Sequence, residues 1–141
     1  CAHDARKAEE LGASGVVWSN HGGRQQDRVQ PALHIVAEEM PLVGDTQLDF
    51  MMDGGVRNGT DILIALTYGI KAVGIGRVTA AGIGAGGHAG LTRAFEILHS
   101  DLDRAMRLVG VQSVEEIHSR GAEIRRESKL RGDGHLPGFE F

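Results

Sequence analysis

Residues 15–25 have the sequence Gly15-Val16-Val17-Trp18-Ser19-Asn20-His21-Gly22-Gly23-Arg24-Gln25, a short apolar strand that runs directly into a polar loop. His21 is a side chain that exchanges a proton near neutral pH. Arg24 offers a planar charged fork that matches a carboxylate, and the two glycines allow the backbone between them to turn tightly. The stretch therefore predicts chemistry on a small organic acid at a strand-to-loop junction. A surface loop with an ordinary histidine is the alternative.

Two further glycine clusters follow apolar stretches and favour binding of a phosphate. Asp53-Gly54-Gly55-Val56-Arg57-Asn58-Gly59-Thr60-Asp61 comes after Phe50-Met51-Met52, and Gly74-Ile75-Gly76-Arg77 comes after Ala72-Val73. Glycines let backbone N–H groups approach an anion, a helix beginning at Thr60 would direct its positive end nearby, and the arginines add charge. Each cluster alone could be a plain turn. Three clusters, each behind a strand, together predict a cofactor site.

The periodicity of apolar residues predicts strands that alternate with helices. We expect helices at 2–11, 31–40, 60–68 with Thr60 as N-cap, and 91–109, and strands at 15–19, 48–52 and 72–76. Ser113 and Glu116 predict a capping box for a short last helix. This alternation is typical of an α/β fold with about three parallel strands. Residues 119–141 have mixed charges and no periodicity, which predicts a disordered tail.

Composition excludes several classes of function. The formal net charge of −4 does not favour a nucleic-acid partner, which requires a basic surface. No apolar run of about 18 residues predicts a membrane span, and the histidines lack metal-ligand spacing, so we assign no metal. The single cysteine, Cys1, excludes an internal disulfide and fits an intracellular compartment, with cytoplasm and mitochondrion left undecided.

From about Ala2 to Ile117 these motifs resemble the FMN-dependent 2-hydroxy-acid oxidases and dehydrogenases, a family that includes glycolate oxidase, lactate oxidase, mandelate dehydrogenase and flavocytochrome b2. The resemblance implies that residues 1–118 are the C-terminal part of a TIM (β/α)8 barrel. It also implies that His21 is the active-site base and that Arg24 binds the substrate carboxylate. The positions that match the family's FMN-binding residues are Asp53, Gly54, Gly55, Val56, Arg57, Gly76 and Arg77.

The resemblance implies oxidation of an L-2-hydroxy acid to the 2-oxo acid, with FMN as cofactor and with oxygen, a cytochrome or a quinone as the electron acceptor. A complete enzyme is expected to form a homo-oligomer. A whole barrel needs about 250 residues, so we expect this chain of 141 residues to be part of one, with the family's flavin-contacting lysine and substrate-pocket tyrosines upstream.

Two alternatives stay open. The chain could be an inactive truncated fragment of such an enzyme. It could also belong to another phosphate-binding barrel that resembles IMP dehydrogenase or the flavin-dependent isopentenyl diphosphate isomerases, although residues 19–25 count against this. The segment after Arg77 also departs from the family pattern, because Val78, Thr79, Ala80 and Ala81 replace its usual proline and aromatic residues. The glycines that follow predict an irregular helix there.

Overall fold

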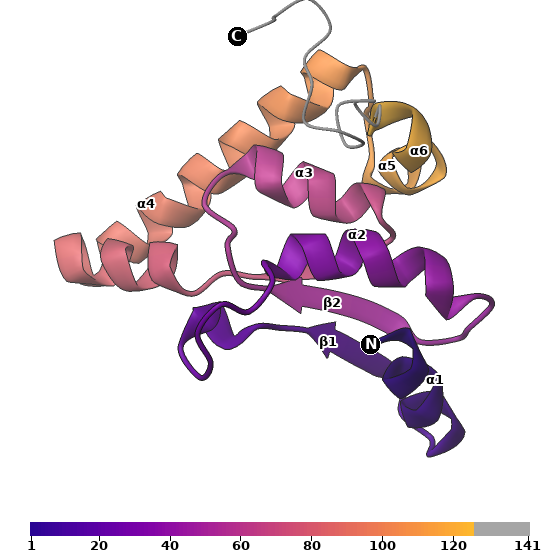
Figure 1. The fold of residues 1–141 in the computed structure, drawn as a ribbon. Coiled ribbons are helices and arrows are strands. Elements are labelled where there is room, and N and C mark those ends of the chain that lie inside the picture. The colour runs from indigo at the N-terminus through magenta and orange to yellow at the C-terminus, as the bar shows by residue number, and fades with distance from the viewer. Residues whose placement is uncertain (126–141) are drawn as a thin grey trace, which may run out of the picture.

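A computed structural model describes residues 1–125 (Figure 1). Three parallel strands form one sheet in the order β1-β2-β3. The elements in chain order are α1 (Ala2–Glu10), β1 (Gly15–Trp18), the 3-10 turn η1 (His21–Gly23), α2 (Ala32–Val43), β2 (Asp49–Asp53), α3 (Gly59–Thr67), β3 (Ala72–Gly74), α4 (Arg77–Val109), α5 (Val114–Ser119) and α6 (Gly121–Ile124). The predicted α/β class with three parallel strands is confirmed.

The two faces of the sheet have different surroundings because side chains alternate along each strand. Trp18, Phe50 and Met52 are buried on one face, where the Trp18 and Phe50 rings stack with their centroids 6.2 Å apart. Helices α2 and α3 lie over this face (Figure 1). Val17, which has the opposite orientation, is 52% exposed. The residues that share its orientation therefore form a second, accessible face.

Helix α3 begins earlier than the sequence predicted. Asn58, not Thr60, is the N-cap: its side chain accepts a hydrogen bond from the Asp61 N–H at 2.9 Å, and the Asp61 carboxylate accepts one from the Asn58 N–H at 3.2 Å. This reciprocal pair satisfies two N–H groups that the first turn leaves without helical partners. Gly59 consequently becomes the first helical residue, and its N–H donates to Asp101 Oδ2 of α4 at 2.7 Å.

Helix α4 begins at Arg77 rather than at the predicted residue 91. The irregularity expected of the glycine-rich segment is concentrated at Gly86 and Gly87, whose backbone angles are not helical. They divide α4 into a short arm, residues 77–85, and a long arm, residues 88–109. The arms touch where Gly82 meets Gly90: a Cβ on Gly90 would lie 2.0 Å from the Gly82 carbonyl oxygen. Glycine at both positions thus permits the close approach.

The last described residues fold against the carboxyl end of α3. Ser113 is the N-cap of α5 and accepts a hydrogen bond from the Glu116 N–H at 3.2 Å, which is half of the predicted capping box; the Glu116 carboxylate accepts instead from the Gln112 N–H at 2.9 Å. Beyond Ser119 the structure differs from the predicted tail, since α6 follows and Arg125 donates to the Thr67 carbonyl oxygen at 2.9 Å. The Arg125 guanidinium also lies 3.8 Å from the centre of the Tyr68 ring. The rest of that prediction, residues 126–141, lies outside the described residues.

Candidate functional site

The carboxyl ends of β1 and β2 bring Ser19 and Asp53 together. Val17 pairs with Met51 in the parallel register, and two residues further along each strand the register places Ser19 beside Asp53. The Ser19 hydroxyl donates to Asp53 Oδ1 at 2.5 Å. On the other side, Gly74 pairs with Asp53, and a Cβ on Gly74 would lie 2.9 Å from the Asp53 Cβ. Gly74 therefore leaves the space that the Asp53 side chain occupies.

Residues 19–31, which we call the His21 loop, are organised by Asn20. The Asn20 side chain accepts from the Gly22 N–H at 3.0 Å and donates to the Gln30 carbonyl oxygen at 3.2 Å, so it joins the two ends of the loop. Asn20 also explains one glycine of the second cluster. A Cβ on Gly54 would lie 2.6 Å from Asn20 Oδ1, and the φ of Gly54 is +90°.

Two residues were predicted to contact the substrate: His21 is the first residue of the turn η1, and Arg24 is its C-cap. Both are exposed, and His21 has φ +53°, a left-handed conformation uncommon outside glycine. Gly22 and Gly23, between them, line a cavity of about 270 Å³. His21 and Arg24 themselves do not line it. The structure thus places both predicted residues beside the cavity rather than in its wall.

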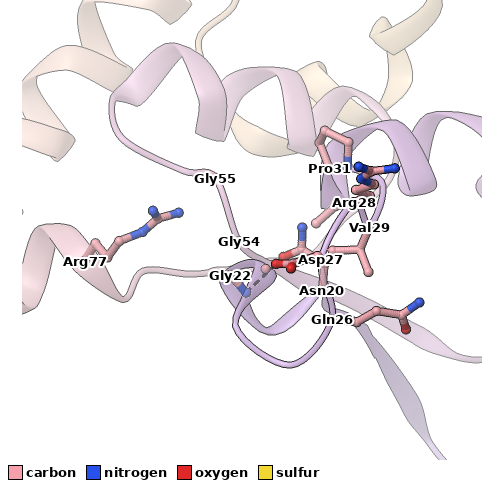
Figure 2. Close-up of a pocket in the computed structure, with 12 residues that line it drawn as sticks. Asn20, Gly22, Gln26, Asp27, Arg28, Val29, Pro31, Gly54, Gly55 and Arg77 are labelled. Carbon is pink, nitrogen blue, oxygen red and sulfur yellow. Dashed lines mark hydrogen bonds between the residues drawn. The ribbon is translucent and has the colours of Figure 1, made fainter.

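The cavity brings residues from all three predicted motifs together. Gly22 and Gly23 come from the first motif, Gly54 and Gly55 from the second and Arg77 from the third. Figure 2 shows the Arg77 side chain extending from the start of α4 toward the Gly54–Gly55 segment. Asp27 and Arg28 of the His21 loop also line the cavity, so it contains charges of both signs.

Gly55 of the cavity wall, and Gly76, which precedes Arg77 and does not itself line the cavity, have exposed backbone. Gly55 has φ +85°, and neither Gly55 nor Gly76 has a heavy atom within 4 Å of the position that a Cβ would occupy. The backbone at both positions is therefore open to a ligand. Together with the exposed guanidinium of Arg77, these groups can bind a phosphate through N–H donors and a full positive charge.

The remaining predicted cofactor residues have other surroundings. Val56 is 9% exposed and belongs to the hydrophobic core. The Arg57 side chain is exposed, while its backbone N–H donates to Asp61 Oδ2 at 2.9 Å. Neither residue lines the cavity. Among residues 1–125, no group of three or more histidine, cysteine or acidic side chains is placed to hold a metal, and no helix is long and apolar enough to cross a membrane.

Sequence reasoning gave no role to Ser19 or Asn20. Alternate residues of a strand point to the same face of the sheet, so Ser19 shares the face of Val17, and Asp53 shares the face of Met51. The sequence shows this alternation, but only the register of β1 against β2 shows that Ser19 and Asp53 are neighbours. For Asn20 the sequence predicts only that its side chain forms a hydrogen bond to nearby backbone in a turn, and it does not identify Gly22 and Gln30 as the partners.

Comparison with known proteins identifies the family. The model of the FMN-dependent dehydrogenase family matches residues 1–123. The chain belongs to this family. Relatives similar to it include the L-lactate dehydrogenase (cytochrome) of Saccharomyces cerevisiae, which is 44% identical over an alignment of 118 residues that covers 81% of this chain. The protein of the same name from Wickerhamomyces anomalus is 36% identical over an alignment of length 158, gaps included, that covers 97% of this chain.

Solved structures of the FMN-dependent family agree with the fold. A mandelate oxidase variant with bound (S)-mandelic acid superposes with a TM-score of 0.78 at 36% identity over 84% of this chain. The three-stranded sheet with its flanking helices is therefore part of the family's barrel. The chain spans 20% and 28% of the two lactate dehydrogenases and 35% of the mandelate oxidase chain, so it corresponds to about a third or less of each protein.

Proposed function

We propose that this chain supplies part of the active site of an enzyme that oxidises an L-2-hydroxy acid to the 2-oxo acid with FMN. One observation carries the proposal: the cavity between the glycine clusters and Arg77 is adjacent to the turn that bears His21 and Arg24. This arrangement sets an anion site beside a proton-transfer group and a carboxylate-binding group. The family to which the chain belongs is FMN-dependent, which supports the choice of cofactor.

The residues proposed to hold the FMN phosphate and ribityl chain are those of the second and third motifs. Gly55 and Gly76 offer exposed backbone, Gly54 lies in the cavity wall, and Arg77 offers a cation that would form charge-assisted hydrogen bonds. Asp53, Val56 and Arg57 complete the set at the head of α3. When bound, FMN supplies the acceptor for two electrons, since amino-acid side chains do not carry that chemistry.

Substrate handling is assigned to the His21 loop. The Arg24 guanidinium would bind both oxygens of the substrate carboxylate and so fix the orientation of the hydroxyl-bearing carbon. An imidazole nitrogen of His21 would accept one of the two protons that the hydroxy acid loses, and the second proton would pass with the two electrons to the bound cofactor. The His21 ring is exposed toward the solvent side of the turn, where a substrate could reach it.

Binding of FMN to the 141-residue chain tests the cofactor half of this proposal. We expect weak binding, because β1 and β3 have unpaired outer edges and one face of the sheet is accessible, which leaves a bound ring exposed. Binding should depend on the phosphate, so riboflavin should bind less tightly than FMN, and Arg77→Ala should remove the difference. Flavin fluorescence during titration measures both. Tight, stoichiometric binding, or equal affinity for riboflavin and FMN, would contradict the proposed site.

A chimera tests the catalytic half. Residues 1–125 would replace the matching segment of the Saccharomyces cerevisiae relative, whose own segment is the control. We expect the chimera to oxidise a 2-hydroxy acid, His21→Ala to abolish turnover while most of the FMN remains bound, and Arg24→Lys mainly to raise KM. An active His21→Ala chimera would eliminate the role assigned to that residue. Retention of FMN without turnover in the parent chimera would refute the proposed reaction.

A further inference from the structure

We propose that Ser19 is a positioning residue that connects Asp53 to His21, so that a change at the Asp53 carboxylate is transmitted to the backbone of His21. The inference deepens the proposed function, because it assigns a device that holds the proposed proton acceptor in register with the proposed cofactor loop. The link consists of two hydrogen bonds that share the Ser19 hydroxyl.

The Ser19 hydroxyl uses both of its hydrogen-bonding capacities in this link. Its single hydrogen is donated to Asp53 Oδ1, with an oxygen–oxygen distance of 2.5 Å, and its oxygen accepts the His21 N–H at 3.0 Å. A bond from a hydroxyl to an ionised carboxylate is short and strong. Donation to the carboxylate also makes the hydroxyl oxygen a better acceptor, since linked hydrogen bonds polarise one another.

The strand register and a small neighbouring residue place the two side chains of this link together. The parallel register sets Ser19 against Asp53 from one side, and Gly74 leaves room for the Asp53 side chain from the other. The hydroxyl and the carboxylate both point to the sheet face opposite the buried Trp18 and Phe50. Small residues at positions 19 and 74 therefore bring the carboxylate within reach of the His21 backbone.

His21 requires such a restraint because of its backbone conformation. A φ of +53° is unfavourable for a residue with a Cβ, and such conformations persist where surrounding contacts enforce them. Asn20 restrains Gly22 and Gln30, which leaves the His21 N–H to Ser19. The direction of the imidazole, and thus the place where it accepts a proton, depends on this backbone position.

Asp53 begins the segment that continues into Gly54 and Gly55, two residues of the cavity wall. A ligand that hydrogen-bonds to the free oxygen of Asp53, or that shifts this segment, would change the strength of the Ser19 bond. The change would then reach His21 through the shared hydroxyl. Ser19 thereby connects occupancy of the cavity to the geometry of the proton acceptor.

The decisive experiment follows the His21 amide by NMR in the 141-residue chain. Asp53→Asn keeps an acceptor oxygen but removes the charge, so it should weaken the Ser19 bond and move the His21 amide resonances. In Ser19→Ala the same Asp53→Asn change should leave these resonances unmoved, because the shared hydroxyl is gone. In Ser19→Thr, which retains the hydroxyl, the effect of Asp53→Asn should return. Asp27→Asn, in the same loop, is the matched control, and its effect should be the same with and without Ser19.

Amide hydrogen exchange provides the second measurement. Loss of one hydrogen bond to the His21 N–H in Ser19→Ala should accelerate its exchange by about fivefold. Ser100→Ala, at an exposed position on α4, is the matched control and should leave the rate unchanged. An unmoved His21 amide in Asp53→Asn, an effect of Asp53→Asn that persists in Ser19→Ala, or unchanged exchange in Ser19→Ala would overturn the proposal.

Neither measurement depends on turnover. If the chimera described above fails to oxidise hydroxy acids while the His21 amide still follows Asp53, then the proposed function is wrong and the Ser19 link stands. If turnover is present and the amide does not follow Asp53, then the link is wrong and the function stands. Asp53→Asn and Ser19→Thr keep the test valid even where Ser19→Ala does not fold.

Discussion

Gly59→Ala is expected to destabilise the protein more than an ordinary glycine-to-alanine change in a helix. Gly59 is the first residue of α3 and lies directly against the backbone of α4. A Cβ at this position would be 2.0 Å from the Leu102 nitrogen, 2.4 Å from the Asp101 carbonyl carbon and 2.6 Å from the Leu102 Cα. All three atoms are backbone, so no side-chain rotation relieves the contact.

The size of the effect follows from the displacement that relief requires. Ordinary van der Waals contact begins near 3.4 Å, so the shortest contact, at 2.0 Å, demands that α3 and α4 separate by about 1.4 Å. Such a movement opens the cluster that includes Leu63, Leu66 and Ala105, and it lengthens the bond from the Gly59 N–H to Asp101. Overpacking usually costs about 1–3 kcal/mol. We expect about 3 kcal/mol or more here, because rigid backbone forms the contact.

Urea unfolding, followed by circular dichroism and by Trp18 fluorescence, measures this free energy. Gly84→Ala is the matched control: Gly84 is in the short arm of α4, and no heavy atom lies within 4 Å of its Cβ position. Alanine there should stabilise the chain by up to about 1 kcal/mol through helix propensity. A Gly59→Ala protein as stable as the parent would refute the close α3–α4 contact on which this reasoning rests.

Two further predictions concern the C-terminal helices. The pKa of Asp101 is held below its usual value, mainly because the carboxylate accepts the Gly59 N–H. The ionised carboxylate therefore stabilises the fold above about pH 4, and this contribution is lost as the pH falls further. In acid unfolding, the free energy of unfolding of Asp101→Asn should fall less steeply below about pH 4 than that of the parent. Arg125→Ala should lower the free energy of unfolding by about 1–2 kcal/mol, because it removes the hydrogen bond to Thr67 and the contact with the Tyr68 ring, and an unchanged urea midpoint would contradict this.

The sequence predicted the architecture because the signals for it are local. An apolar stretch followed by a glycine-containing polar loop occurs three times, and this repetition predicts parallel strands with loops at one edge of the sheet. His21 and Arg24 were found for the same reason, since both lie within one contiguous run. The N-cap of α3 was misplaced by two residues, because Asn58 and Thr60 are both good capping residues and only the position of Asp61 decides between them.

Features that depend on contacts distant in sequence were not predictable. The link from Ser19 to Asp53 joins residues 34 positions apart and requires the strand register. The short arm of α4 contains two glycines, Gly82 and Gly84, which lower intrinsic helix propensity, yet it is helical and packs closely on the long arm where Gly82 meets Gly90. The position of α6 likewise depends on the carbonyl group of Thr67, which accepts the Arg125 bond across 58 residues.

The division of α4 at Gly86 and Gly87 separates the part of the helix that packs in the core from the part that lines the cavity. The residues of α4 that are buried, Leu98 and Ala105, are in the long arm, whereas Arg77 and its accessible surroundings are in the short arm. Substitutions between residues 77 and 85 can therefore alter the surface beside the cavity while the packing against α3 stays intact. For the proposed phosphate site, this means that ligand preference can be changed in the short arm without a compensating change in the core.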